Sequence, residues 1–259
     1  MDTLTAQRLT VTIAGKRICH DLDLVIRSGE RWAILGPNGS GKTTLLHTLA
    51  GLRPAQGGEI RLRHRPISTW HPRERATMLG TLLQHYDDPF PSTVLETALI
   101  GRHPFLKRWQ WADGNDIAQA QTALTSMDLS GFENRTIATL SGGERRRLAI
   151  ATLLTQNPQF MLLDEPTNHL DLMHQIQTLS LFNRLVTQQN RALVMVLHDI
   201  TSAVHYCDHA LLVFGDGKTL TGTITAVINE ANLSRLYGHA IRRLVTPEGD
   251  VWAPAFSND

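Results

Sequence analysis

Cysteine is scarce in this chain of 259 residues, which contains only Cys19 and Cys207. Two cysteines cannot build a disulfide framework, and their spacing is not that of a C-x-x-C redox or metal motif. Because disulfides persist mainly in oxidising compartments, a chain without such a framework suits a reducing cytosol. The scarcity therefore excludes the small, disulfide-stapled class of secreted proteins.

Long apolar segments are missing as well. The longest apolar runs cover about five residues, such as Leu193–Leu197, whereas a transmembrane helix needs roughly 18 or more. The N-terminal segment MDTLTAQRLT contains Asp2 and lacks the apolar centre of a signal peptide. We therefore expect a chain that is not secreted, does not span a membrane and reaches a membrane only through a partner.

Neither sign of charge is in excess. The chain has 25 Lys and Arg against 24 Asp and Glu, a formal net charge of +1, and charged residues make up 19% of the sequence. An ordinary soluble protein has about 25% charged residues. This balance argues against a protein that holds nucleic acid through bulk positive charge. By length, the chain fits one large domain or two small ones.

Three short apolar runs predict strands of a parallel sheet that is covered on both faces. They are Trp32–Leu35, Phe160–Leu163 and Ala192–Leu197, and each is followed by a glycine or a polar residue. The carboxyl ends of parallel strands share one edge of a sheet, and ligands of open α/β sheets bind at that edge. We therefore expect these strands to bring functional residues to one rim.

Other segments predict antiparallel strands and helices. Ahead of the first apolar run, apolar alternation predicts antiparallel strands joined by a turn at 14–16. A helix over Thr44–Ala50 should end at Gly51. The stretch of about 87–140 has helical patterns and a capping box at Thr93–Glu96, so we expect a helical insertion between two α/β portions.

Two patterns predict how particular side chains are exposed. Ile60, Leu62 and His64 alternate with three arginines, which predicts a half-exposed strand with the arginines on one solvated face. These arginines are Arg61, Arg63 and Arg65. A phosphate or lipid-headgroup contact is the alternative for that face. A later segment has apolar residues at helical spacing, and the stripe comprises Leu172, Ile176, Leu179, Phe182 and Val186.

The segment Gly36–Thr43 has the spacing G-x-x-x-x-G-K-[ST] of a phosphate-binding loop, between a predicted strand and a predicted helix. Glycines let backbone N–H groups point into one concavity, and the helix N-terminus adds its dipole. Lys42 supplies positive charge for the outer phosphates, and the Thr43 hydroxyl can ligate Mg²⁺. The predicted nucleotide contacts are Gly36, Pro37, Asn38, Gly39, Ser40, Gly41, Lys42, Thr43 and Thr44.

An acidic pair, Asp164 and Glu165, follows the apolar strand Phe160–Leu163. Alone, such a pair could be an exposed acidic turn. Beside a phosphate loop, Asp164 can hold Mg²⁺ directly or through water, and Glu165 can orient and deprotonate an attacking water. The two motifs together predict the hydrolysis of a nucleoside triphosphate.

A second anion cradle opens another predicted helix, at Ser141, Gly142, Gly143 and Glu144. One nucleotide does not need two cradles on one chain, but two copies placed head to tail would use both. With this ordered set of motifs, the chain resembles the ATP-binding subunit of an ATP-binding-cassette (ABC) transporter over nearly its whole length. The resemblance implies that this signature closes on the ATP held by the other copy.

The resemblance also implies the fold and the domain limits. The fold class would be α/β, a P-loop NTPase of ABC type, with a mostly parallel core sheet, an N-terminal antiparallel β subdomain and an inserted helical subdomain. Residues 1–240 would form a single ABC ATPase domain, with the helical subdomain at roughly 87–157. Residues 241–259 would be a C-terminal extension.

Further site residues follow from the resemblance. Gln84 matches the Q-loop glutamine, which contacts Mg²⁺ and water, and His198 matches the switch histidine, which contacts the γ-phosphate. Thr167–Asp171 resembles the D-loop, which helps to couple the two sites. The family commonly has an aromatic residue near position 13 that stacks on adenine. Here Ile13 lacks that stacking, which is worth about 0.5–1.5 kcal/mol.

Three clusters have a functional interpretation that we consider weaker than a structural one. His205, Cys207, Asp208 and His209 could suggest a metal site, but alternate residues project to different faces, so packing is favoured. Arg145–Arg147 is interpreted as a solvated helix face rather than a nucleic-acid patch. Trp109 and Trp111 are interpreted as packing within the helical subdomain, with contact to a membrane partner as the alternative.

The implied partners are ATP with Mg²⁺, a second copy of the subunit and a separate transmembrane permease. A periplasmic substrate-binding protein would act indirectly, no nucleic acid is expected, and the location would be the cytoplasmic face of the inner membrane. The alternative is a soluble ABC ATPase that acts on nucleic acid or in an assembly process. A single cassette without a charged linker or a long coiled-coil insertion argues against it.

Two segments point to the kind of cargo. Gln84–Pro104, which includes Pro89-Phe90-Pro91, and Leu233–Gly238, followed by a predicted strand pair around Gly249, are similar to the importer ATPases for iron–siderophore, haem and cobalamin. Import of cobalamin is the first hypothesis, and import of an iron–siderophore or haem is the second.

Overall fold

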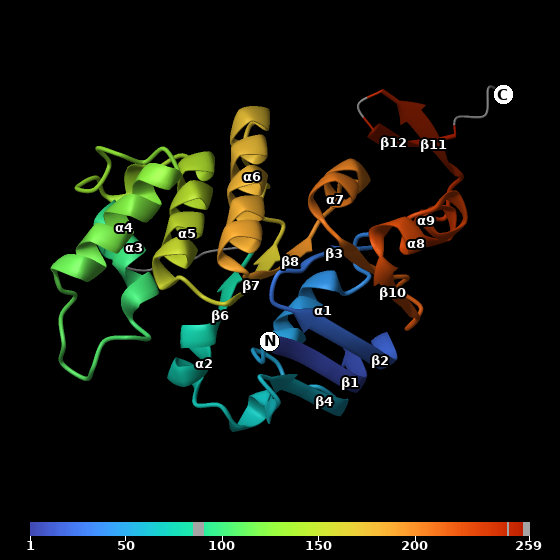
Figure 1. The fold of residues 1–259 in the computed structure, drawn as a ribbon, viewed down its shortest axis with the longest axis horizontal. Coiled ribbons are helices and arrows are strands. Elements are labelled where there is room, and N and C mark those ends of the chain that lie inside the picture. The colour runs from blue at the N-terminus through green and yellow to red at the C-terminus, as the bar shows by residue number, and fades with distance from the viewer. Residues whose placement is uncertain (85–90, 248, 256–259) are drawn as a thin grey trace.

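Two β-sheets, a group of helices and a terminal hairpin make up the structure, a computed structural model that describes residues 1–84, 91–247 and 249–255. Figure 1 shows the helical group on one side and the hairpin at the far end on the other side. None of the helices in these ranges is long and apolar enough to cross a bilayer.

The larger sheet has six strands in the order β10-β9-β3-β8-β7-β6. Its strands are β3 (Arg31–Leu35), β6 (Leu79–Leu82), β7 (Phe160–Asp164), β8 (Ala192–Val196), β9 (His209–Val213) and β10 (Thr219–Thr223). All pairs are parallel except β9 with β10. Every residue of β7 and β8 is buried. The three predicted strands are confirmed as the neighbours β3, β8 and β7, whose carboxyl ends form one rim.

The smaller sheet is antiparallel and has the order β2-β1-β4-β5. Its strands are β1 (Thr3–Ile13), β2 (Lys16–Arg27), β4 (Gly57–Leu62) and β5 (Arg65–Pro66). Ala14 and Gly15 join β1 to β2 and both have positive φ, as a tight turn requires. The predicted antiparallel N-terminal portion and its turn are therefore confirmed.

Helices flank the larger sheet and form the insertion. They are α1 (Lys42–Leu49), α2 (Pro72–Met78), α3 (Val94–Leu99), α4 (Gly114–Ser126), α5 (Gly142–Gln156), α6 (Leu172–Gln189), α7 (Ile200–Tyr206), α8 (Ile224–Val227) and α9 (Glu230–Tyr237). Helices α3, α4 and α5 lie between β6 and β7 in the chain and group together in Figure 1, which confirms the inserted helical part. Thr93 and Glu96 form the predicted capping box of α3. Gly51, with φ +69°, follows α1 as predicted.

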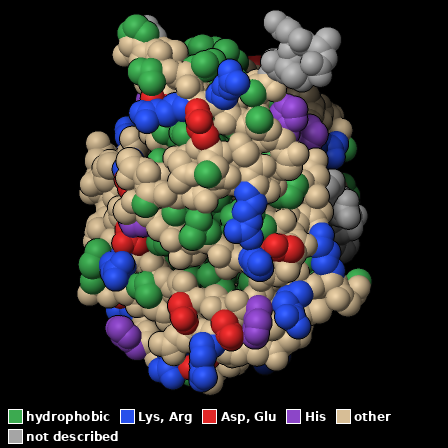
Figure 2. Space-filling model, turned by 90° about the vertical axis from the view of Figure 1, so that its right-hand side faces the viewer, with side chains coloured by type: hydrophobic (Ala, Val, Ile, Leu, Met, Phe, Trp, Pro, Cys, Tyr) green, Lys and Arg blue, Asp and Glu red, His purple; other side chains and the backbone are tan. Residues whose placement is uncertain are grey.

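A hairpin of β11 (Ile241–Thr246) and β12 (Gly249–Pro254) confirms the strand pair predicted around Gly249. Figure 2 shows the side of the molecule that lies at the right of Figure 1, where Lys and Arg lie among Asp and Glu rather than in one block. Ion pairs such as Arg235–Asp216 and Arg243–Asp250 occur in this C-terminal part of the chain.

The arginine-rich segment after β4 is not the continuous strand that alternation predicted. β4 ends at Leu62, and Arg63 and His64 adopt positive φ of 50° and 66° in a tight turn. Leu62 then pairs with Arg65 across the turn to β5. A turn of two residues reverses the chain, so the alternation of the sequence does not follow one face.

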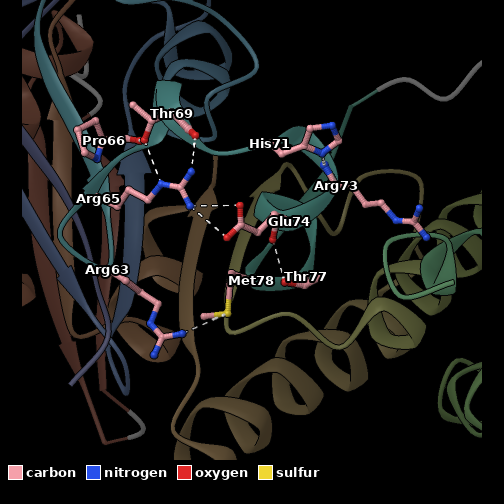
Figure 3. Close-up of polar contacts among 9 residues, drawn as sticks. All are labelled: Arg63, Arg65, Pro66, Thr69, His71, Arg73, Glu74, Thr77 and Met78. Atoms are coloured by element: carbon pink, nitrogen blue, oxygen red, sulfur yellow. Dashed lines mark hydrogen bonds and ion pairs between the residues drawn. The ribbon is translucent and has the colours of Figure 1, made fainter. Parts of the chain in front are cut away.

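Each arginine of that segment also has an acidic partner of its own. In Figure 3 the Arg65 guanidinium lies between Thr69 and the Glu74 carboxylate, and Arg63 points toward Met78. The ion pairs are Arg61–Glu59 (2.6 Å), Arg63–Asp2 (2.8 Å) and Arg65–Glu74 (3.1 Å). The three arginine side chains are solvated as predicted, and Ile60 and Leu62 are buried, but the prediction that one continuous strand carries all three arginines is wrong.

Two expectations about apolar side chains need correction. In α6, Leu179, Phe182 and Val186 are buried in the core as predicted, but Leu172 and Ile176 are exposed because the first turns lie outside the core cluster. Trp109 and Trp111, which lie between the 3₁₀ turn Ile100–Arg102 and α4, are 89% and 90% exposed. The favoured prediction that these tryptophans pack within the helical part is therefore wrong.

The histidine–cysteine cluster at 205–209 has the structural role that was favoured. Asp208 pairs with Arg31 at 2.5 Å, and His209 stacks on Trp32 with ring centroids 4.6 Å apart. Within the described ranges, no group of three or more His, Cys, Asp or Glu side chains is arranged to hold a metal ion.

Candidate active site

The phosphate loop, residues 36–43, connects β3 to α1 and depends on its glycines. Gly39 and Gly41 have φ of +71° and +99°, a region that residues with a side chain rarely adopt. A Cβ atom at Gly41 would lie 2.3 Å from the Ile18 side chain, and one at Gly36 would lie 2.5 Å from the Val213 carbonyl oxygen. Two causes therefore require glycine in this loop: the positive φ at Gly39 and Gly41, and the close approach of neighbouring atoms at Gly36 and Gly41.

Two lysines are tied to this loop. Lys42 Nζ donates to the carbonyl oxygens of Gly36 (2.8 Å) and Pro37 (3.1 Å), so its amine lies over the loop. Burial lowers the pKa of Lys42, and the nearby carboxylates of Glu165 and Asp164 oppose that change. Lys16, which the sequence analysis did not single out, reaches from β2 and donates to the Gly39 carbonyl at 2.7 Å.

A cavity of about 790 Å³ lies over the phosphate loop. Its walls bring together loop residues, the N-terminal hairpin and the polar residues at the ends of β6, β7 and β8. The lining residues are Ile13, Ala14, Lys16, Ile18, Asn38, Gly39, Gly41, Lys42, Thr43, Thr44, Gln84, Glu165 and His198. Residues far apart in the sequence therefore meet at one rim, and Ile13 forms part of the wall.

The Asp164 carboxylate is fully buried next to this cavity. Neither of its oxygens has a hydrogen-bond partner in the described part of the chain. Burial raises the pKa of Asp164, and the neighbouring Thr43 hydroxyl opposes the rise. A buried carboxylate without partners is costly unless a cation compensates it, and oxygen ligands are those that Mg²⁺ prefers. The predicted set of Thr43, Gln84 and Asp164 therefore suits Mg²⁺.

Glu165 is the centre of the polar contacts at this rim. Its carboxylate accepts hydrogen bonds from Gln84 Nε2 (3.0 Å) and from the Asn168 amide, and its Oε1 lies 2.5 Å from His198 Nε2. Its backbone has φ +48°, the left-handed region that is unusual for glutamate. The structure thus brings the three predicted catalytic residues, Glu165, His198 and Gln84, into direct contact.

Asn168 was not assigned a role from the sequence, although it lies in the predicted D-loop. The sequence signal for this contact was the position of Asn168 three residues after Glu165. In a turn, a side-chain amide at that spacing can bind the earlier carboxylate. At the end of the same segment, Asp171 begins α6 and accepts a hydrogen bond from the His174 N–H at 2.9 Å. The D-loop is therefore fixed at both ends.

The signature residues lie apart from the cavity. Ser141 is the N-cap of α5, its hydroxyl accepts from the Glu144 N–H (3.2 Å), and Glu144 accepts from the Ser141 N–H (2.7 Å). This backbone hydrogen bond lowers the pKa of Glu144, which also lies 3.6 Å from Arg135. Neither these two residues nor Gly142 and Gly143 line the cavity of their own chain. The exposed end of α5 thus lies outside the cavity that contains the phosphate loop of the same chain.

The three arginines after the signature do not form the solvated face that was expected. Arg145 is exposed, but it donates to the carbonyls of Leu140 and Ala138, both at 3.2 Å. Arg147 donates to two carbonyls that follow α4. Arg146 is buried, because it shares a helix face with the buried Ile150 and Leu153. That helical spacing was the sequence signal for its burial.

One sequence indicator cannot be compared with the structure. Pro89 and Phe90, part of the segment that is similar to importer ATPases, lie outside the described residues. Gln84 is the last described residue before that gap, and Pro91 is the first after it.

Comparison with known proteins agrees with this geometry. Residues 19–168 match the family model described as ABC transporter. The hemin import ATP-binding protein HmuV of Escherichia coli O157:H7 is 34% identical over 250 residues, which cover 94% of this chain and 95% of that protein. HmuV of Myxococcus xanthus is 37% identical, over 90% and 92% of the two chains. YvrA of Bacillus subtilis, an uncharacterised ABC transporter ATP-binding protein, is 40% identical, but the match spans only 47% of its length.

Solved structures are similar over the same extent. A metal-chelate type ABC transporter in an inward-facing conformation has a TM-score of 0.85 and 26% identity, over 99% of this chain and 98% of that chain. A dimeric ATP-binding cassette in a post-hydrolysis state with ADP and Pi has a TM-score of 0.75 and 25% identity, over 85% and 98%.

Proposed function

This chain belongs to the ABC transporter family of ATP-binding proteins, and from that premise we propose that it powers the import of a metal chelate through a separate membrane permease. As an ABC ATPase, it binds and hydrolyses ATP. The cavity that joins the phosphate loop to Gln84, Glu165 and His198 supports ATP hydrolysis, and the similarity to importer ATPases over nearly the full chain carries the proposal of import. The hemin import ATPases, which match nearly the full chain, support the direction of transport.

The chemistry follows from the contacts at the rim. The backbone of the phosphate loop and Lys42 bind the phosphates, and Glu165 polarises and deprotonates the attacking water. His198 and Gln84 hold the two carboxylate oxygens of Glu165, so the base is oriented before the substrate arrives. Thr43, Asp164 and Gln84 would hold Mg²⁺, which would supply charge neutralisation at the phosphates.

We propose further that the working unit contains two copies of the chain. The signature at Ser141–Glu144 lies outside the cavity of its own chain, so a second copy has to supply it. The similar cassette solved as a dimer with ADP and Pi supports this arrangement. In each copy, residues 1–240 act as one ATPase unit with the helical part at 87–157, and 241–259 is an extension.

The permease contact is proposed for the surface where α2 meets the helical part. A hollow of about 290 Å³ there is lined by Leu52, Ile100 and Pro104 among others, and Leu52 and Ile100 expose apolar side chains. Arg73 Nε of α2 donates to the Pro104 carbonyl at 3.1 Å, which fixes one wall. The exposed Trp109 and Trp111 follow along the chain and suit anchoring roles. A cytoplasmic helix of the permease would bind here and place the subunit at the cytoplasmic face of the inner membrane.

Hemin is the cargo that the relatives support best, because two relatives that match nearly the full chain are hemin import ATP-binding proteins. Cobalamin, the first hypothesis from the sequence, and iron–siderophores stay predictions. The test uses vesicles that carry the permease, with this subunit inside and the periplasmic binding protein outside. They should take up labelled hemin from outside only when ATP is inside. Uptake of cobalamin but not hemin would reverse the order of the cargo hypotheses.

The soluble ABC ATPase, the alternative from the sequence, would give a different result. Co-purification of the chain with a polytopic membrane protein supports the importer, whereas co-purification with nucleic acid, in the absence of a permease, would contradict it. The importer relatives that cover the full chain favour the first outcome.

A further inference from the structure

Arg146 of α5 is buried against the catalytic rim, where it binds four backbone carbonyls of the described residues. It is 7% exposed. Its Nη1 donates to the Leu83 carbonyl (2.7 Å), and its Nη2 donates to those of Asp164 (2.5 Å) and Glu165 (2.6 Å). Its Nε donates to the Pro166 carbonyl at 3.2 Å. One side chain thus joins the signature helix to two separate segments of the active site.

Those carbonyls belong to the backbone that places the reactive side chains. Leu83 directly precedes Gln84, and Asp164 ends β7. Glu165 has its φ at +48°, a sparsely populated conformation that persists only where the surroundings hold it. The guanidinium donates to the carbonyl oxygens of Asp164, Glu165 and Pro166, so it holds the backbone before, at and after the residue with the strained φ.

We propose that Arg146 is a positioning residue for ATP hydrolysis, which fixes the backbone of Glu165 and of the segment before Gln84 to the helix that carries the signature. The proposal rests on the function of Glu165 as the base. Arg146 follows Ser141 by five residues, about 7.5 Å along a helix. A shift of α5 when the second copy engages Ser141 would therefore act directly on the orientation of Glu165.

An arginine suits this role better than other side chains of similar length. Its planar guanidinium has five N–H donors in a fixed fork, and the contacts here reach four carbonyl oxygens. A lysine has three donors on one nitrogen, and a glutamine has two. Arg146→Lys keeps the charge with fewer directed bonds, and Arg146→Gln removes the charge and most of the bonds.

A matched control exists at the other end of β7. Arg191 is 8% exposed, donates to the Pro158 carbonyl at 3.2 Å and contacts the Asn157 side chain. The length of β7 separates these contacts from those of Arg146, roughly 13 Å at 3.3 Å per residue. Arg191→Gln therefore removes a buried arginine of the same kind without touching the catalytic rim.

The experiment measures ATP affinity, thermal stability and single-turnover hydrolysis for the full chain. We expect Arg146→Gln to slow hydrolysis by about 10-fold to 100-fold, the range for misplaced catalytic groups, while ATP affinity changes by less than about 2-fold. Arg146→Lys should recover part of the rate. Arg191→Gln should lower thermal stability and leave the rate per folded molecule unchanged. Equal losses of rate in Arg146→Gln and Arg191→Gln would overturn the proposal.

A double-mutant cycle with Glu165→Gln separates positioning from general damage. If Arg146 acts through the base, Arg146→Gln should cause no further loss of the slow residual hydrolysis in the Glu165→Gln background. The same fold-loss in both backgrounds would contradict the proposal. If Arg146→Gln does not fold, Arg146→Lys carries the same cycle. Glu165→Gln by itself tests the base assignment, so a failure of that assignment is seen separately from a failure of the Arg146 proposal.

Discussion

The strongest test of the site replaces the carboxylate of Glu165 by an amide of the same shape. In the structure, one carboxylate oxygen accepts from Gln84 and Asn168, and the other lies 2.5 Å from His198 Nε2. The oxygen of a glutamine can keep the first two contacts, and its NH₂ group can donate to a neutral His198. Glu165→Gln therefore preserves the hydrogen bonds and removes only the ability to accept a proton.

The size of the expected effect follows from that argument. Loss of a general base slows a reaction by about 10²-fold to 10⁴-fold, which corresponds to about 2.7–5.5 kcal/mol of transition-state stabilisation. Binding of ATP with Mg²⁺ should be nearly unchanged, because the phosphate loop and Asp164 are untouched. Since hydrolysis no longer releases the closed state, the variant should accumulate as an ATP-bound dimer.

The assay combines nucleotide affinity, single-turnover hydrolysis of labelled ATP and light scattering for molecular mass. Glu30→Gln is a suitable control, because Glu30 precedes β3 at the opposite end of the sheet and bonds to Trp32 Nε1. It should hydrolyse ATP normally. Near-normal hydrolysis by Glu165→Gln would refute the base assignment, and His198 would be the first alternative.

Three further substitutions test other parts of the site. Lys42→Ala removes the amine over the phosphate loop and should lower ATP affinity as well as turnover; retained affinity in a binding titration would contradict its role. Ser141→Arg places a bulky charge at the exposed start of α5, and should abolish ATPase activity and ATP-dependent dimers while nucleotide binding persists. Normal hydrolysis by this variant would rule out the two-copy site. The double change Trp109→Ala with Trp111→Ala should lower transport more than the basal ATPase of the isolated subunit, since both side chains are exposed. Equal loss of both activities would argue against permease docking.

Local patterns were enough to predict the central strands and the phosphate loop. The backbone of 36–43 is set by glycines and by the strand and helix on either side, and all of these are adjacent in sequence. Burial of β7 and β8 on both faces makes them continuous apolar runs, which stand out in any sequence. The position of Asp164 and Glu165 at a strand end followed from the same pattern.

Local patterns failed where the outcome depended on a distant partner or on a single turn. The apolar stripe of α6 correctly identified the face of the helix that packs on the core. Which turns of that face are buried depends on how far the core extends along the helix, and Leu172 in the first turn is exposed. The turn at Arg63 and His64 reversed the chain where alternation predicted a strand. Arg145–Arg147 appeared solvated because charge is usually outside, yet Arg146 finds carbonyl partners up to 63 residues away.

The sequence by itself determined that this chain binds a nucleoside triphosphate and belongs with ATPases that work in pairs, because the phosphate loop, acidic pair and signature are each contiguous. Only the tertiary structure decided that Gln84 and His198 contact the two carboxylate oxygens of Glu165, and that Arg146 binds its backbone carbonyl. The physical reason is that Gln84, Glu165 and His198 follow three different strands and Arg146 comes from α5, so these contacts exist only once β6, β7 and β8 pair in register and α5 packs against them. Pairing brings together residues that no local pattern connects.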